Sequence, residues 1–318
     1  MSSVGDLSEQ PVLVLGGTGH YGRHIVRSML RAGAPTRVLT RNAPSAHSLL
    51  GEQVEVVEGD ITSAPSVTAA FRGVGSVVVA ISAFSPKLIR QQRRVERDAV
   101  LALLDEMRRQ GISRVVYVSV YDIDKELVER FDLEDARIKL EIENRLARSD
   151  FDWTVLGASP SMQLFFSLIR GGRLLVVPGG GPPALPTISA RDVGEIAAQA
   201  ALRDDLGGMR IRMTGPQALS FAQAAQQISS ATGKHIGFRP VPFLPIETAA
   251  LIARPFNPYL QQVVAHLKVL KHFPQAIAEQ VPADHRRLLE TFWYTPTTLE
   301  MEARQHFGGV SGDAAPKR

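Results

Sequence analysis

The first 156 residues consist of short apolar runs separated by longer segments in which apolar and polar positions follow a helical spacing. Within each run the apolar residues are adjacent, which is typical of strands buried on both faces of a parallel sheet. We predict six strands, at residues 12–15, 36–40, 54–58, 76–82, 114–120 and 153–156. Because helical segments separate these strands, we expect right-handed crossovers and a doubly wound α/β fold.

The pattern loosens after residue 156, where glycine and proline interrupt it repeatedly. A short strand is predicted inside the Gly/Pro-rich segment 171–186, a helix at 188–202 and a further strand at 209–215. A helix at 219–233 and a strand at 236–241 then precede helical segments broken by prolines. We therefore predict a sheet domain (1–156 with 188–215), a smaller helix-rich lobe (157–187 and 216–307) and a disordered tail (308–318).

Three glycines, Gly16, Gly19 and Gly22, lie between the first strand and the first helix. The first permits a tight turn, the second lets the backbone approach a bulky anion, and the third allows close packing of helix on sheet. The free N–H groups and the dipole of the helix also favour a negative charge. A tight turn without a ligand does not explain all three glycines. The loop predicts a Rossmann-type dinucleotide site, with further cofactor contacts from Thr18, His20 and Tyr21.

The second strand ends in Thr40-Arg41-Asn42, without the acidic residue that NAD-selective sites use to bind the ribose 2′-hydroxyl. An arginine at this place can hold the 2′-phosphate of NADP instead. The alternative is an ordinary surface arginine. We expect a preference for NADP(H) over NAD(H), with Arg41 as its determinant. After the third strand, Asp60 and Ile61 either face the adenine or, in the case of Asp60, cap the following helix.

The composition excludes several classes of protein. The chain has 318 residues and no cysteine, so disulfides, thiolate catalysis and cysteine-based zinc sites are excluded. The N-terminal segment lacks a signal-peptide pattern, and the longest apolar run, near residues 77–84, is far shorter than the ~20 residues of a membrane span. We expect a soluble cytoplasmic protein with no membrane partner. A homodimer is compatible with the sequence, which does not determine the oligomeric state.

The basic residues do not form a nucleic-acid-binding patch. The net charge is only +4, and the densest basic cluster is interrupted by Glu96 and Asp98. We interpret this cluster as a solvated helix face and expect no nucleic-acid partner. The cluster consists of Arg90, Arg93, Arg94 and Arg97.

No motif predicts a metal site or another enzyme class. His20 and His24 have the spacing of helical zinc ligands, but no glutamate of an HExxH motif and no third ligand accompany them. Cofactor packing explains His20 better than a metal does. The chain also lacks the nucleophile elbow of α/β-hydrolases and the phosphate loop of P-loop NTPases.

Taken together, these motifs resemble the atypical branch of the extended short-chain dehydrogenase/reductase superfamily, the NmrA-like and isoflavone-reductase-like proteins. The resemblance extends over about residues 10 to 240 and rests on GGTGHYG (16–22), TRN (40–42), GDIT (59–62), RVVYVS (114–119), KLEIENRLARSDFDWTVL (139–156), ISARDVGEIAA (188–198) and MRIRMTGPQALSFAQAAQQISSATG (209–233). It implies a Rossmann domain with a small helix-rich C-terminal substrate lobe. It also implies reduction of small carbonyls, quinones or enones, or cofactor binding without turnover in a redox sensor.

The resemblance assigns roles to four further residues. Ala80 and Ser82 would line the cofactor after the fourth strand. Ser119 would lie near the nicotinamide at the end of the fifth strand, and Lys139 would hold the nicotinamide ribose. The segment 157–160 departs from the family pattern, because relatives usually carry Arg-Pro there, beside the substrate.

The family's general acid is absent. Short-chain dehydrogenases usually carry a tyrosine four residues before the lysine, and this position is Asp135. A lysine lowers the pKa of a neighbouring tyrosine so that it can donate a proton, whereas a carboxylate there is ionised and a poor acid. Tyr121, two residues beyond Ser119, and Lys139 itself are the alternative proton donors.

Two functions therefore fit the sequence. The first is an NADPH-dependent reductase, and the second is a non-catalytic cofactor-binding regulator. Aromatic residues of the C-terminal part either line a substrate pocket or, for most of them, pack in the core: Phe243, Phe256, Tyr259, Phe273 and Trp293. An open pocket over the nicotinamide favours the enzyme, and a filled one favours the regulator.

Overall fold

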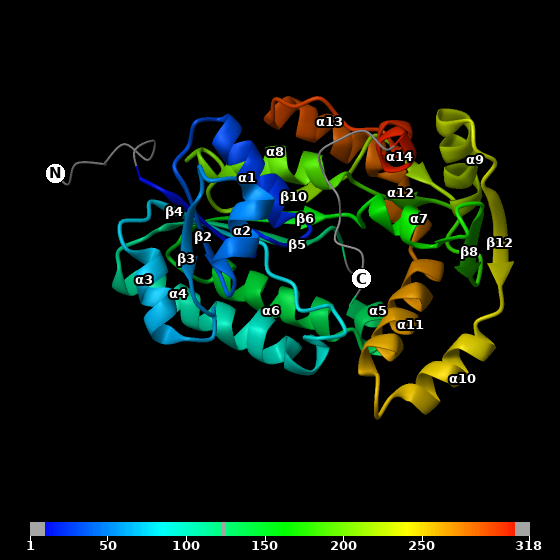
Figure 1. Cartoon of the computed structure of the whole chain (residues 1–318), viewed down its shortest axis with the longest axis horizontal. Coiled ribbons are helices and arrows are strands. Elements are labelled where there is room, and N and C mark those ends of the chain that lie inside the picture. The colour runs from blue at the N-terminus through cyan, green and yellow to red at the C-terminus, as the bar shows by residue number, and fades with distance from the viewer. Residues whose placement is uncertain (1–9, 123–124, 309–318) are drawn as a thin grey trace.

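Seven parallel strands form the central sheet of the computed structural model, which describes residues 10–122 and 125–308 (Figure 1). The spatial order is β10-β6-β5-β4-β1-β2-β3. The strands are β1 (Val12–Leu15), β2 (Thr36–Thr40), β3 (Glu55–Glu58), β4 (Ser76–Val79), β5 (Arg114–Val120), β6 (Asp152–Ala158) and β10 (Met209–Met213). The predicted doubly wound sheet is thus confirmed, including the late return of residues 209–215. The order reverses between β1 and β4, which is where such sheets bind ligands.

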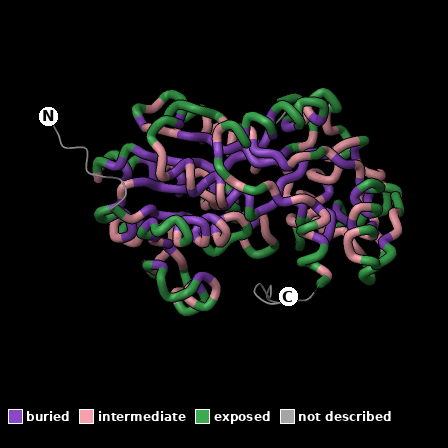
Figure 2. The backbone as a smooth tube through the Cα atoms, turned by 90° about the horizontal axis from the view of Figure 1, so that it is seen from above, coloured by how far each residue is buried: buried purple, intermediate pink, exposed green. Residues whose placement is uncertain are grey.

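Helices cover both faces of the sheet (Figure 1). One face carries α1 (Gly22–Arg31), α2 (Ala43–Leu50) and α8 (Ala190–Ala201), and the other carries α3 (Ala64–Phe71), α4 (Ala99–Arg109) and α6 (Glu134–Ala147). Figure 2 shows the strands as a mostly buried layer between helices whose outer sides are exposed. Burial on both faces explains why the strand segments contain adjacent apolar residues.

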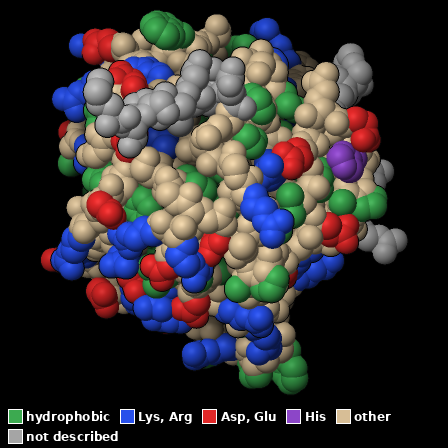
Figure 3. All heavy atoms as spheres, turned by 90° about the vertical axis from the view of Figure 1, so that its left-hand side faces the viewer, with side chains coloured by type: hydrophobic (Ala, Val, Ile, Leu, Met, Phe, Trp, Pro, Cys, Tyr) green, Lys and Arg blue, Asp and Glu red, His purple; other side chains and the backbone are tan. Residues whose placement is uncertain are grey.

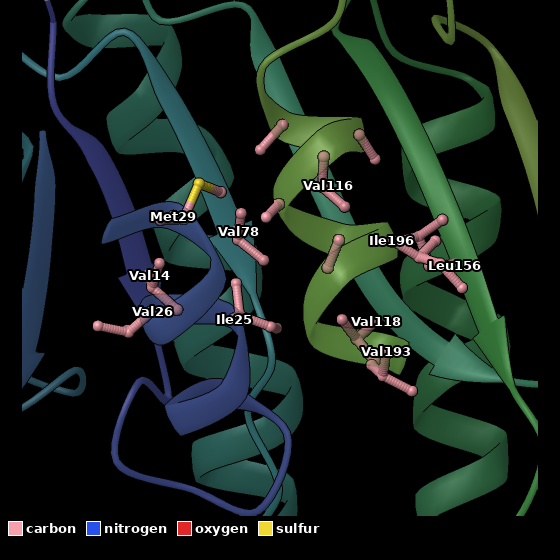
Figure 4. Close-up of a cluster of buried hydrophobic side chains, with 14 of the residues drawn as sticks. Val14, Ile25, Val26, Met29, Val78, Val116, Val118, Leu156, Val193 and Ile196 are labelled. Atoms are coloured by element: carbon pink, nitrogen blue, oxygen red, sulfur yellow. The ribbon is translucent and has the colours of Figure 1, made fainter. Parts of the chain in front are cut away.

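The helices α1 and α8 pack side by side on the sheet (Figure 4). Ile25 and Met29 of α1 and Val193 and Ile196 of α8 point onto the strands and are fully buried. A Cβ at Gly194 would lie 2.7 Å from the backbone of His24, so only glycine allows this approach of the two helices. Packing of α8 on α1 therefore requires the glycine of the segment ISARDVGEIAA (188–198).

A smaller region beyond β6 has its own core. It contains the sheet β12-β8-β7 and the pair β11-β9, formed by β7 (Ile169–Arg170), β8 (Leu174–Pro178), β9 (Leu185–Pro186), β11 (Ala218–Leu219) and β12 (Gly237–Val241). Its helices are α7 (Gln163–Ser167), α9 (Phe221–Thr232), α10 (Leu244–Ala253), α11 (Pro258–Lys271), α12 (Gln275–Glu279) and α14 (Leu299–Gly308). The helix α13 (Val281–Thr291) lies against β10 instead, and its Leu288 is buried in the core of the main sheet. The division into two domains stays a prediction, and the tail beyond Gly308 lies outside the described residues.

The long helix predicted to end near residue 110 is not a regular α-helix in its first turns. It begins with the 3₁₀ turn η1 (Ile89–Gln91) and the π-helical turn η2 (Arg93–Asp98) before α4 continues it. Glu96 of η2 is buried and accepts a hydrogen bond from the backbone N–H of Ala83. This hydrogen bond joins the π-helical turn η2 to the loop after β4. Prediction from the sequence also missed the short helices α5 (Lys125–Arg130) and α7.

Within the described ranges, no helix is long and apolar enough to cross a membrane.

A buried carboxylate fixes the C-terminal segment to α8. Asp192 accepts hydrogen bonds from the backbone N–H of Thr297 at 2.9 Å and from its hydroxyl at 2.6 Å. The side chain of Asp192 is almost completely buried. This burial raises the pKa of Asp192 to about 6, and the two hydrogen bonds from Thr297 offset only part of the effect.

Replacing Asp192 with asparagine is expected to flatten the pH dependence of stability. Since the folded state holds the Asp192 proton up to pH about 6 and the unfolded chain releases it near 3.8, the free energy of unfolding falls as pH rises through this window. Asp192→Asn removes this contribution. Urea unfolding of both proteins across the window tests it, with Asp105→Asn as an exposed control on α4. Equal slopes for wild type and Asp192→Asn would contradict the assignment.

Candidate functional site

A groove of about 740 Å³ lies beyond the carboxyl ends of β1, β2, β3 and β4. Ten of the twelve predicted cofactor contacts line it: Gly16, Thr18, Gly19, His20, Tyr21, Arg41, Asp60, Ile61, Ala80 and Ser82. Gly22 lies behind the loop, and Lys139 is not among the lining residues. The sequence motifs thus converge on one concave surface at the switch point of the sheet.

The glycine loop is held by contacts that no other residue permits. Gly16 has a φ of +81°, and a Cβ there would lie 2.4 Å from the carbonyl oxygen of Ala80. A Cβ at Gly22 would lie 2.0 Å from the carbonyl oxygen of Gly16. Gly17, which sequence reasoning did not single out, would place its Cβ 2.6 Å from the side chain of Val38. Packing within the protein therefore demands Gly16, Gly17 and Gly22.

Gly19 differs from the other glycines of the loop. It is exposed to the groove, and the shortest contact of an added Cβ would be 3.0 Å, to the carbonyl oxygen of Gly16. The following helix α1 begins at Gly22 with no side-chain cap and no acidic residue in its first turn. The backbone N–H groups of Gly19, Arg23 and His24 donate within the loop and the first turn, so the positive end of the α1 dipole, beside an exposed glycine, makes this end of the groove suitable for an anion.

The far end of the groove combines a carboxylate with two arginines. Asp60 accepts hydrogen bonds from the backbone N–H and the hydroxyl of Thr62, each at 2.8 Å. The bond from the Thr62 backbone is the main cause that lowers the pKa of Asp60, and the charges of Arg41 and Arg94 act in the same direction. Asp60 thus orders the turn before α3 but does not cap that helix, whose N-cap is Ser63, and it also lines the groove.

Arg94 is a groove residue that sequence reasoning missed. Its guanidinium lies 3.4 Å from the hydroxyl of Thr62, whereas Arg93 bonds to Glu134 and Arg97 to Glu141. A regular helix places all these arginines on a solvated face. The π-helical turn η2 shifts the side-chain positions and turns Arg94 to the groove, and no local sequence signal marks this turn.

The predicted catalytic side chains have partners within the protein. The hydroxyl of Ser119 donates to Glu143 at 2.5 Å. Lys139 Nζ donates to the carbonyl oxygen of Val118 at 3.3 Å and lies 5.5 Å from the ring centre of Tyr117. Neither Ser119 nor Lys139 lines the groove.

Tyr121, which was expected near the nicotinamide, does not line the groove. Its ring is 2% exposed, and its hydroxyl donates to Asp284 of α13 at 2.6 Å. Burial and the bond to Asp284 raise the pKa of Tyr121. The reason for this position is that β5 ends at Val120, after which the side chain turns toward the edge of the sheet where α13 packs.

Asp135, which stands in place of the family tyrosine, is bonded to a residue of α11. His266 Nε2 donates to Asp135 Oδ2 at 3.0 Å, and its Nδ1 donates to the carbonyl oxygen of Gln262 at 2.8 Å. Although burial favours the neutral acid, the bond and charge of His266 together with Lys139 lower the pKa of Asp135. Burial also opposes the charge on His266, but the bond to Asp135 raises the pKa of His266. The centre of the His266 ring lies 4.7 Å from the centre of the Phe84 ring, and Phe84 lines the groove.

The loop after β6 reaches the glycine loop through a hydrogen bond. His20 Nε2 and Ser161 Oγ lie 2.8 Å apart. Desolvation and the charge of Arg23 lower the pKa of His20 to about 4, so its imidazole is neutral at neutral pH. His20 therefore connects the segment after residue 160 to the groove. Within the parts of the chain that the structure covers, no group of three or more His, Asp or Glu side chains could hold a metal ion.

The variant Tyr121→Phe is expected to lower the free energy of unfolding by about 1–3 kcal/mol, because Asp284 loses a buried hydrogen-bond donor. Cofactor affinity and turnover are expected to stay unchanged. Denaturant unfolding and NADPH titration measure these effects. Tyr294→Phe is the control, since the buried hydroxyl of Tyr294 has no hydrogen-bond partner within the described residues. Lost turnover at unchanged stability would instead support Tyr121 as the proton donor.

Comparisons with known proteins identify the family and the fold. The sequence profile of a family described as NAD(P)H-binding matches residues 16–204, more than half of the chain. The NAD(P)H azoreductase of Xenophilus azovorans is 27% identical over 230 residues, which cover 71% of this chain and 76% of that protein.

Two solved structures share the fold. Triphenylmethane reductase of Citrobacter sp., complexed with NADP(H), superposes with a TM-score of 0.72 at 18% identity, covering 93% of this chain and 99% of that one. NmrA, a negative transcriptional regulator in complex with NADP, gives 0.70 at 18% identity, covering 95% and 96%. The motif order, the groove and the profile match lead to one assignment: the chain belongs to the NAD(P)H-binding family.

Proposed function

We propose that this protein is an NADP(H)-dependent oxidoreductase that transfers a hydride to a small carbonyl, quinone or enone. One observation carries the proposal: a single groove contains the glycine loop, the N-terminal end of α1 and the basic end of β2. This arrangement offers the positive end of a helix dipole for a pyrophosphate at one end and cations for a further phosphate at the other. The reductase relatives support the reaction type, and the structures with NADP(H) support the choice of cofactor.

The residues present fit a dinucleotide. The backbone at Gly19 and the positive end of the α1 dipole would lie against the pyrophosphate, and Arg41 would hold the 2′-phosphate. Ala80 and Ser82 would face the ribose side, while Lys139 would have to leave the carbonyl oxygen of Val118 to reach the nicotinamide ribose. The bound cofactor supplies the hydride, and the protein supplies orientation and electrostatic stabilisation.

The Asp135–His266 pair bears on the class of acceptor. Reduction of a simple ketone produces a strongly basic alkoxide, which requires a proton donor in the site. The pKa of Asp135 is lowered by its bond to His266 and the charge of Lys139, and neither Asp135 nor His266 lines the groove. A quinone or an enone yields a more stable anion that can take its proton from water. The pair therefore favours these acceptors over simple ketones.

The second candidate is a regulator that binds the cofactor without turnover. It is favoured by the internal bonds of Ser119, Lys139 and Tyr121, which leave none of them at the surface of the groove. The fold shared with the NADP complex of NmrA is compatible with it. In this case occupancy of the groove would shift contacts with a partner.

The variant Arg41→Ala is expected to weaken NADPH binding about tenfold or more and to leave NADH binding nearly unchanged, because a charged hydrogen bond contributes ~1.5–3 kcal/mol. Titration of the melting temperature with each nucleotide measures the difference. Arg72→Ala, an exposed arginine after α3, is the control and should change neither affinity. An equal loss for both nucleotides would contradict the role of Arg41.

Oxidation of NADPH by quinones and enones is expected for the wild-type protein, and Lys139→Ala should lower kcat by about tenfold or more, because the nicotinamide ribose loses the side chain that orients it. The measurement is the loss of reduced-nicotinamide absorbance, with Lys234→Ala as a control in the C-terminal region. NADPH that stabilises the fold but is oxidised by no acceptor would favour the regulator. An absence of stabilisation by any nucleotide would contradict both candidates.

A further inference from the structure

An unusual share of the exposed apolar surface lies on α10 and the turn that follows it. Four of the eight large hydrophobic side chains that are exposed in the described chain fall within residues 244–256. They are Leu244, Leu251, Ile252 and Phe256, with exposed fractions of 73%, 66%, 72% and 88%. We call these four residues the α10 patch. A cluster of this kind on a globular protein marks an interaction site.

The spacing places the α10 patch on one side of an apolar helix. Leu244, Thr248, Leu251 and Ile252 follow one another at intervals that share a helix face. The opposite side is also apolar, and its Ala250 is buried where α10 packs on α11. A helix that is apolar on both sides is normally covered on both, and α11 covers only one.

The charges around the α10 patch are positive. Of the twelve exposed residues between 240 and 257, Arg254 is the only charged one. The acid of α10, Glu247, is half-buried and paired with Lys268 at 3.1 Å. Arg90 donates to the carbonyl oxygen of Pro255 at 2.7 Å, which places a second exposed cation beside the turn. An apolar surface bordered by cations complements an anionic lipid surface.

The shape of the molecule also exposes this region. The turn between α10 and α11 is the lowest point of the molecule in Figure 1, and the lowest projection in Figure 3 carries hydrophobic side chains next to Lys and Arg. A narrow apolar projection can enter the boundary between lipid headgroups and acyl chains, whereas a stable interface between copies needs a broad matching surface.

We propose that the α10 patch docks this protein on the surface of a membrane that contains anionic lipids. Leu251, Ile252 and Phe256 enter the headgroup boundary, and Arg254 and Arg90 bind lipid phosphates. This surface attachment requires no spanning helix, and it revises the expectation from sequence that the protein has no membrane partner. Tyr259 in the first turn of α11 packs against Phe84 of the groove lining, with 5.2 Å between the ring centres.

Sedimentation with lipid vesicles tests the proposal. Wild-type protein is expected to bind vesicles of equal parts phosphatidylglycerol and phosphatidylcholine, and to bind pure phosphatidylcholine more weakly. The double variant Ile252→Ser/Phe256→Ser should lose about tenfold or more of this binding, since two large apolar side chains no longer enter the lipid. Trp293→Ser is the matched control, because Trp293 is 85% exposed but lies outside the α10 patch.

Three results would overturn the proposal. They are no binding of the wild type to the anionic vesicles, equal binding by the double variant, and an equal loss for Trp293→Ser. Light scattering of the same proteins adds a fourth: a wild-type dimer that the double variant converts to a monomer, without vesicle binding, would make the α10 patch an interface between copies. Because the mixtures contain no nucleotide, their outcome is independent of the proposed oxidoreductase activity.

Discussion

The contact between the start of α1 and the turn after β1 is the constraint on which the site depends. With no Cβ at Gly22, the helix begins directly against the carbonyl oxygen of Gly16, and with none at Gly16 the turn lies against Ala80 of the neighbouring strand end. These two contacts fix the direction of α1, whose positive dipole end lies at the glycine loop that lines the groove. Gly194 then brings α8 against α1, and both helices bury the same face of the sheet. The shape of the groove thus depends on glycines, which have no side chain, at positions 16, 22 and 194.

The sheet could be predicted from sequence because its signals are local. Each strand is a short run of adjacent apolar residues, and each glycine of the loop acts on neighbours in the chain or on the adjoining strand. The position of Arg94 could not be predicted, because it depends on a π-helical turn that has no compositional signature. The partners of Asp135 and Tyr121 are separated from them by 131 and 163 residues, and only the folded chain brings them together.

The polar residues near the expected nicotinamide position show a balance between stability and chemistry. Ser119 bonds to Glu143, which also receives Arg210 of the edge strand at 2.8 Å. Such a network satisfies polar groups that would otherwise be costly to bury. The same bonds hold Ser119 away from any ligand. A side chain that acts on the substrate here must first break a hydrogen bond within the protein. The free energy lost with that bond reduces the gain in rate from a proton donor of the protein. Acceptors that need no such donor avoid this cost.

The helix α11 connects the two surfaces discussed above. Its His266 bonds to Asp135 of α6 and contacts Phe84 at the groove, and its first turn carries Tyr259 on the other side of the same phenylalanine. Directly before it, the turn with Phe256 is held by Arg90 of η1. Packed rings and the Asp135–His266 contact thus connect this turn to the groove. Because a coupling free energy between two binding sites is reciprocal, any effect of the engaged α10 patch on cofactor affinity would have to equal the effect of the cofactor on engagement of the α10 patch.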